Sequence, residues 1–138
     1  MSNNGIVVVR GGGDIATGTI YRLHRCGFRV LVLESDAPTA IRRTVSFCEA
    51  IYDTQTTVED VSAVHVSSVD QCTAVWESNK VAVLIDLQAK SIKNLQPLAV
   101  VDAILAKKNF GTNMDMAPIT IGLGPGFTAG NDVHAVIE

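Results

Sequence analysis

Short runs of aliphatic residues recur along the chain, separated by glycine turns and by stretches of mixed polarity. Continuous apolar runs bounded by turn residues are typical of strands buried on both faces of a parallel sheet. They predict strands over residues 6–9, 28–33, 81–85, 119–123 and 133–137. Two weaker patterns predict a brief strand over 50–52 and one or two short edge strands over 58–66.

Apolar residues spaced three or four positions apart predict helices between these strands. The first follows Asp14, a candidate N-terminal cap, and ends at Gly27. Others are expected from about Thr39, over 68–79, and from Pro97 into a stripe formed by Leu98, Val101, Ile104 and Leu105. This alternation predicts an α/β fold, a Rossmann-like doubly wound, mostly parallel sheet with helices on both faces, in a single domain over residues 1–138.

Composition narrows the function classes. Of the 138 residues, 47% are hydrophobic and 18% charged, too apolar for disorder, yet no apolar run approaches the length of a membrane span. The net charge of −3 and the lack of a basic cluster argue against a nucleic-acid partner. No secretory signal opens the chain, so a cytoplasmic protein is expected. The three cysteines form no CxxC pair, and no structural metal is expected.

The first glycine cluster carries the strongest chemical signal. Gly11-x-Gly13-x-x-Ala16 lies between a predicted strand and a predicted helix, as the dinucleotide fingerprint requires. Glu34 ends the next strand, 23 residues after Gly11, where a carboxylate binds a ribose hydroxyl. The predicted ligand is NAD(P) or another nucleotide, and the alternative is a plain tight turn. The predicted cofactor-binding residues of this unit are Arg10, Gly11, Gly12, Gly13, Asp14, Ala16, Thr17 and Glu34.

Two arginines follow this unit. Arg42 and Arg43 are candidates for binding a phosphate at the outer edge of the same crevice. A solvated helix face is an equally good interpretation.

A second glycine cluster follows the predicted strand at 119–123. If that strand runs parallel to the first, both glycine loops emerge at the carboxyl edge of the sheet and could line one crevice. The candidate binding residues here are Gly122, Gly124, Gly126 and Thr128.

Catalytic candidates are few. His134 and Asp86 are weak candidates for proton transfer, and the pair Asp132-x-His134 is more typical of a polar strand edge than of a site. Asp102 lies among apolar residues and would need a partner if buried. The chain lacks the GxSxG, Walker lysine and HExxH motifs of hydrolases, kinase-type enzymes and zincins.

Four segments resemble one protein family, namely VVVRGGGDIATGTIYRLHRCGFRVLVLE, AIRRTVSF, VVDAILAKKN and DMAPITIGLGPGFTAGNDVHAVIE. They are similar to the accessory protein encoded with selenium-dependent molybdenum hydroxylases, a family distantly like the xanthine dehydrogenase accessory factors. The resemblance implies a Rossmann-like maturation factor that handles the molybdenum cofactor or a selenium or sulfur ligand. Members of that family continue beyond the VHAVIE segment, so this chain is expected to be a truncated or a short form.

Three hypotheses follow. The first is a maturation factor that binds a nucleotide or the phosphate-bearing molybdenum cofactor, with the hydroxylase apoenzyme or its maturation machinery as partner. The second is an NAD(P)-dependent oxidoreductase that uses His134 or Asp86 for proton transfer. The third is a non-catalytic scaffold that docks to the hydroxylase. Any of them is compatible with a homo-oligomer.

Overall fold

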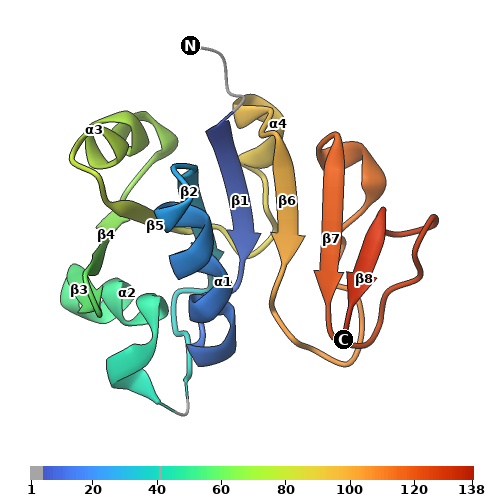
Figure 1. Ribbon diagram of the computed structural model, residues 1–138, viewed down its shortest axis with the longest axis horizontal. Helices are drawn as coiled ribbons and strands as arrows, with labels where there is room; N and C mark the ends of the chain where they lie inside the picture. Colours follow the sequence, from blue (N-terminus) through green and yellow to red (C-terminus); the bar gives the residue numbers. More distant parts are fainter. Residues whose placement is uncertain (1–4, 41) are drawn as a thin grey trace.

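A single twisted sheet organises the protein (Figure 1). The computed structural model describes residues 5–40 and 42–138. Within them the strands are β1 (Ile6–Arg10), β2 (Arg29–Glu34), β3 (Gln55–Val58), β4 (Val61–Val66), β5 (Val81–Ile85), β6 (Ala99–Asp102), β7 (Ile119–Leu123) and β8 (Ala135–Ile137). Their order across the sheet is β3-β4-β5-β2-β1-β6-β7-β8, and every described neighbouring pair is parallel except β3 with β4.

Helices cover both faces of this sheet. The α-helices of the described chain are α1 (Asp14–Arg25), α2 (Ala50–Asp53), α3 (Cys72–Glu77) and α4 (Ile92–Leu95). Short 3-10 helices are η2 (Arg43–Val45), η3 (Phe47–Glu49), η4 (Val69–Gln71) and η5 (Met114–Met116). The predicted α/β, doubly wound and mostly parallel architecture is therefore confirmed.

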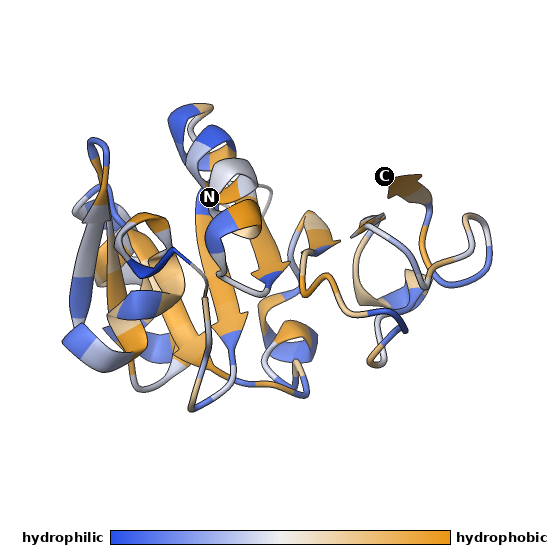
Figure 2. Ribbon diagram, turned by 90° about the horizontal axis from the view of Figure 1, so that it is seen from below, coloured by the Kyte–Doolittle hydropathy of each residue, from blue (hydrophilic) through white to orange (hydrophobic). Residues whose placement is uncertain are grey.

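Two apolar cores lie on opposite faces of the sheet, because side chains alternate along each strand. In β1, Val7 and Val9 pack in one core with Ile20 of α1, whereas Val8 packs in the other core with Ile92 of α4. All five residues of β1 are buried. Figure 2 shows the hydrophobic residues concentrated on the strands. Because both faces of the central strands are buried, these strands are continuous apolar runs rather than alternating ones.

The predicted helix from Pro97 is wrong. Residues Ala99–Asp102 form β6, which pairs with β1 on one side and β7 on the other. The stripe of apolar residues fitted a helical period, but the run from Leu98 to Val101 also fits a short buried strand. Burial of all four strand residues between two neighbours decides in favour of the strand.

Two further predictions around residue 45 are wrong. Residues Ala50–Asp53 form helix α2 rather than a strand. Instead of a helix from Thr39, the described residues form the 3-10 helix Arg43–Val45 followed by the 3-10 helix Phe47–Glu49, and Ile41 lies outside the described residues. Such short segments carry too few residues for their period to be read from the sequence.

Other element predictions are confirmed. Gly27 follows the end of α1 with a φ of +95°, the left-handed conformation that glycine adopts readily after a helix. The prediction of edge strands over 58–66 is confirmed in part, because β4 lies there but is an inner strand, and of the edge strand β3 only Val58 falls in that range. The predicted helix over 68–79 contains η4 and α3. In the described part of the chain, no helix has both the length and the apolar character needed to cross a membrane.

Candidate functional site

The turn between β1 and α1 lies where the order of the sheet reverses. The chain leaves β1 to form β2 on one side, and β6 joins β1 on the other side. In open α/β sheets, ligands bind outside the carboxyl ends of the strands at such a reversal. The glycine turn therefore lies at the position where such sheets bind ligands.

The three glycines of this turn differ in what lies next to them. Gly11 has a φ of +99°, and a Cβ atom built on it would lie 2.8 Å from the Ala103 carbonyl oxygen. Gly12 faces the Val32 side chain and the Cys48 backbone, and its carbonyl accepts the Cys48 N–H at 2.9 Å. A Cβ on Gly13 would have no atom within 4 Å. The first two glycines thus make room for protein, and only the third borders open space.

The start of α1 presents unpaired backbone donors. Thr17 is the first residue whose N–H bonds back to the turn, to the Gly13 carbonyl at 2.9 Å. The preceding N–H groups of residues 13–16 donate to no acceptor within the described residues. Together with the helix dipole, such groups favour an anion.

Two neighbouring cavities border this turn, and we call them the first and second lobes of the crevice. The first, of about 250 Å³, is lined by Gly11–Ala16, Glu34, Thr39, Ala40 and Ala103–Leu105. The second, of about 230 Å³, is lined by Arg10, Gly11, Leu33–Ser35, Ala37–Thr39, Leu87 and Ile104. Four residues line both cavities, namely Gly11, Glu34, Thr39 and Ile104.

Glu34, which the sequence analysis predicts as a ribose-binding carboxylate, lines both lobes. Burial raises its pKa, and a hydrogen bond from the Gly12 N–H opposes that rise. The carboxylate therefore already has one partner in the turn and faces the crevice with its remaining acceptor capacity.

The shifted pKa of Glu34 predicts a pH dependence of stability. The folded state raises the pKa of Glu34 above its ordinary value of 4.5. The contribution of Glu34 to the free energy of unfolding is therefore fully present below pH 4.5, and it is lost as the pH rises through the folded-state pKa. We expect the urea midpoint of the wild type to fall, relative to Glu34→Gln, across this interval and then to level off. Urea titrations of both proteins between pH 4 and 8 measure it. If the urea midpoint of the wild type rose with pH relative to that of Glu34→Gln, the result would contradict the raised pKa of Glu34.

Arg10 is nearly inaccessible and is held by neutral oxygens. Its side chain is 2% exposed. One terminal nitrogen donates to Thr112 Oγ1 at 2.7 Å and the other to the Leu87 carbonyl at 2.9 Å. Thr112 Oγ1 in turn donates to Asp102 Oδ2 at 2.6 Å, so the hydroxyl links the two buried charges. Asp102, 1% exposed, also accepts the Ile104 N–H at 3.1 Å. This chain of contacts supplies the partner that a buried Asp102 requires.

Two of the five N–H donors of Arg10 are used by these acceptors, and the other three have none among the described residues. Burial lowers the pKa of Arg10, and the charges of Asp102 and Asp86 oppose that change. Its Nε–H donates to no acceptor of the described residues, although no buried side-chain N or O atom there lacks a partner. The Nε–H is one of these remaining donors, and Arg10 is among the residues that line the second lobe.

The three other predicted residues of the first unit have different surroundings. Asp14 is the first residue of α1 rather than its cap, since Gly13 occupies the cap position and makes no side-chain bond. Thr17 Oγ1 donates to the Gly13 carbonyl at 2.7 Å and accepts the Phe47 N–H at 3.0 Å. Ala16 is buried in the core beneath α1. Of these three, Asp14 and Ala16 also border the first lobe.

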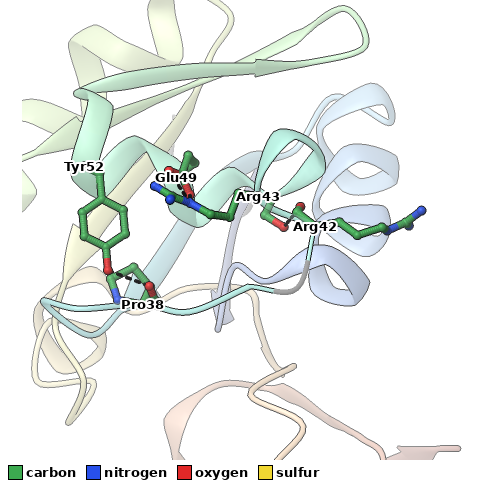
Figure 3. A network of polar contacts seen from close by, with 6 residues as sticks. Pro38, Arg42, Arg43, Glu49 and Tyr52 are labelled. Atoms are coloured by element: carbon green, nitrogen blue, oxygen red, sulfur yellow. Dashed lines mark hydrogen bonds and ion pairs between the residues drawn. The ribbon is translucent and has the colours of Figure 1, made fainter.

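The two arginines after this unit point in opposite directions (Figure 3). Arg43 is ion-paired with Glu49, its Nε lying 3.0 and 3.1 Å from the two carboxylate oxygens, and its guanidinium stacks on Tyr52. Arg42 lies 3.6 Å from the Asp14 carboxylate. Neither lines the crevice, but Arg42 partly neutralises the acidic residue at its mouth.

The second glycine loop begins at the same edge of the sheet, because β7 is parallel to β6 and β6 to β1. None of Gly122, Gly124, Gly126 and Thr128 lines either lobe. A Cβ on Gly122 would lie 2.5 Å from the Phe127 ring, and one on Gly126 would lie 2.9 Å from the Lys108 Cα. Gly124 likewise faces the Leu105 side chain. Gly124 and Gly126 thus allow close packing against residues 105–108, and Gly122 allows it against Phe127 of its own loop.

The two catalytic candidates lie outside the crevice. His134 Nδ1 is 3.0 Å from the Thr120 N–H and 2.8 Å from its hydroxyl, near the amino end of β7. It stands beside β8, three strands from β1, which at the usual spacing is roughly 14 Å away. Asp86 accepts bonds from the Ser91 N–H at 2.8 Å, the Ser91 hydroxyl at 2.6 Å and the Lys90 N–H at 3.0 Å, and so stabilises the turn before α4.

Sequence reasoning missed several lining residues. Thr39, Leu87 and Ala103–Leu105 border the crevice from loops whose positions depend on the sheet order. Each follows a strand's carboxyl end, a signal that could have selected them only with the strand order known. Within the described residues, no cluster of three or more His, Cys, Asp or Glu side chains could hold a metal ion.

Comparison with known proteins gives one informative match. No family model matches the chain, and no solved structure matches it. The chain is 50% identical over 137 residues to the uncharacterized protein YqeB of Escherichia coli (strain K12), a match that covers 99% of this chain and 25% of that protein. The chain therefore spans about a quarter of the length of the curated relative it matches.

Proposed function

We propose that this chain is the ligand-binding part of an accessory protein for maturation of a selenium-dependent molybdenum hydroxylase. Its ligand is a nucleotide or the phosphate-bearing molybdenum cofactor, held in the crevice. The observation that carries the ligand-binding part is that Glu34 lines both lobes, and that residues 13–16, whose N–H groups have no acceptor within the described residues, line the first. The maturation role is proposed from the resemblance of four segments to the accessory family.

The first lobe suits the phosphate. Gly13 leaves it open, and the backbone donors at the start of α1 would bind the phosphate oxygens. Two acidic residues at the lobe, Asp14 and Glu34, oppose an anion. Arg42 lies 3.6 Å from Asp14 and partly offsets its charge, whereas no arginine or lysine is ion-paired with Glu34 in the described residues. The lobe therefore fits a phosphate of low charge, such as a monoester or diester, better than a triphosphate.

The second lobe suits the remainder of the ligand. Glu34 would accept hydrogen bonds from ribose or pterin groups, and the Nε–H of Arg10 would donate one. Leu33, Pro38 and Leu87 line this lobe, and their apolar atoms would contact a ring of the ligand. When bound, the molybdenum cofactor would supply the metal chemistry, and the residues of this chain would hold and orient it.

Calorimetric titration with NAD, NADP, ATP, CDP and molybdopterin tests the proposal. We expect one of these to bind, and Glu34→Gln to weaken it about ten- to hundredfold, the usual loss for a hydrogen bond to a charged group. Gly13→Val should abolish binding by filling the first lobe. Matched controls are Gly18→Val, at an exposed glycine of the same helix with equal free space, and Glu59→Gln in the exposed hairpin turn. Failure of every ligand to bind the wild type would overturn the proposal.

An NAD(P)-dependent oxidoreductase is the second candidate. The spacing of Gly11, Gly13 and Ala16 before Glu34 favours it. Against it, His134 lies outside the crevice and Asp86 is engaged by Ser91. If NAD binds and Glu34→Ala weakens NAD selectively, while hydride transfer to added acceptors is seen, this function replaces the first.

A further inference from the structure

One face of the sheet is left apolar and uncovered at β7 and β8. The register pairs Ile121 with Ala135 and Leu123 with Ile137, and paired residues of parallel strands point to the same face. This places five side chains on one face, which we call the apolar strip: Ile119, Ile121, Leu123, Ala135 and Ile137.

The apolar strip lies on the α1 side of the sheet. Ile121 and Leu123 pack against the core that contains Val7, Val9 and the buried residues of α1. The alternate residues Thr120 and Gly122 point to the other face, where Phe127 covers Gly122. Figure 1 shows α1 and α2 in front of the strands from β1 toward β3, and none of the drawn helices in front of β7 or β8.

The strip is exposed where a solvated strand would carry polar residues. Ile119 is 44% exposed and Ile137 is 55% exposed, and Ala135 is also exposed. In the edge strand β3, by contrast, the exposed positions are Gln55 and Thr57. Figure 2 colours β8 as hydrophobic at the border of the molecule. Parallel sheets are normally covered on both faces, so this composition is typical of a buried surface.

We propose that the apolar strip is the docking surface for an amphipathic helix belonging to the same polypeptide in a longer form of this protein. The relative that matches 99% of this chain devotes only 25% of its own length to the match, so it has ample further chain to supply such a helix. The helix packs its apolar stripe on Ile119, Ile121, Leu123 and Ile137, and it completes the layer that α1 and α2 begin.

Cysteine labelling tests this docking. Ile137→Cys is made in the 138-residue chain and at the aligned position of the full-length relative, and maleimide labelling is followed peptide by peptide by mass spectrometry. We expect labelling at position 137 to be at least tenfold slower in the full-length relative. Thr57→Cys, at a solvent position of β3, is the control and should label equally fast in both proteins. Ile119→Cys repeats the test at the other end of the strip.

Each other outcome decides the matter. Equal labelling rates at 137 in the two proteins, with both proteins folded by circular dichroism, overturn the proposal. Slow labelling already in the 138-residue chain, with a concentration-dependent dimer in sedimentation that Ile137→Lys abolishes, assigns the strip to a second copy and also overturns it. A benzophenone attached at position 137 of the full-length relative should crosslink to a segment with a 3.6-residue apolar period, and crosslinking to a segment without that period contradicts a helix.

Discussion

Replacing Arg10 by methionine should lower the free energy of unfolding by about 3–5 kcal/mol, the usual cost of removing one member of a buried charged pair. The substitution leaves Asp102 buried with only Thr112 and the Ile104 N–H as partners, and it deprives the Leu87 carbonyl of its donor. Methionine keeps most of the side-chain volume, so the loss reports polar contacts rather than a cavity. Urea denaturation at pH 7, followed by circular dichroism, measures it.

The matched control is Arg42→Met. Arg42 has a side chain 72% exposed and lies 3.6 Å from Asp14, and exposed pairs of this kind contribute about 0–1 kcal/mol. A loss below about 1 kcal/mol for Arg10→Met as well would show that the buried contacts of Arg10 carry little net stability.

A double substitution separates the charges from the packing. Arg10→Met with Asp102→Leu removes both buried charges, and apolar replacements of buried pairs are often close to neutral. The double variant should therefore be more stable than the sum of the two single losses predicts, by at least about 1 kcal/mol. Strictly additive losses would mean that Thr112 does not couple Arg10 to Asp102.

The founding unit of the fold could be predicted from sequence because each of its signals is local. The run 6–9, the glycines, the helical period after Asp14 and the strand ending at Glu34 lie within thirty residues, and the structure builds them as β1, α1 and β2. Glu34 reaches the crevice because parallel neighbouring strands end at the same edge.

Segments whose state depends on distant neighbours could not be predicted. The stripe from Leu98 to Leu105 satisfies a helical period, yet the gap between β1 and β7 requires a strand there. The same limit applies to Arg10, whose partners Leu87 and Thr112 are 77 and 102 residues away in the chain. Only the three-dimensional arrangement shows that this arginine is held mainly by the protein.

The second glycine loop shows a different limit. A glycine in the sequence signals close approach, but not whether a ligand or the protein itself approaches. Gly126 admits the backbone of Lys108, and Gly13 admits nothing from the protein. His134 follows this loop in the chain, yet the loop returns it toward the amino end of β7, away from the crevice.

The contrast between Gly11 and Gly13 gives the second large effect. Gly11→Ala should lower the free energy of unfolding by roughly 2–4 kcal/mol, combining a side chain at positive φ with overpacking against backbone. The φ of Gly11 is +99°, and the added Cβ would lie 2.8 Å from the Ala103 carbonyl oxygen, which cannot rotate away as a side chain would. Thermal and urea unfolding measure the loss.

Gly13→Ala, two residues further on, should lower the free energy of unfolding by only about 0.5–1 kcal/mol, because alanine is a poorer N-cap residue than glycine. Its φ of −69° suits alanine, and its Cβ would meet no atom within 4 Å. The added methyl group enters the first lobe instead, so the cost should appear as weaker binding of whichever ligand the calorimetric titration identifies. If Gly13→Ala destabilised the fold as much as Gly11→Ala, glycine would be needed at position 13 for folding. That result would contradict the proposal that Gly13 keeps the first lobe open for a phosphate.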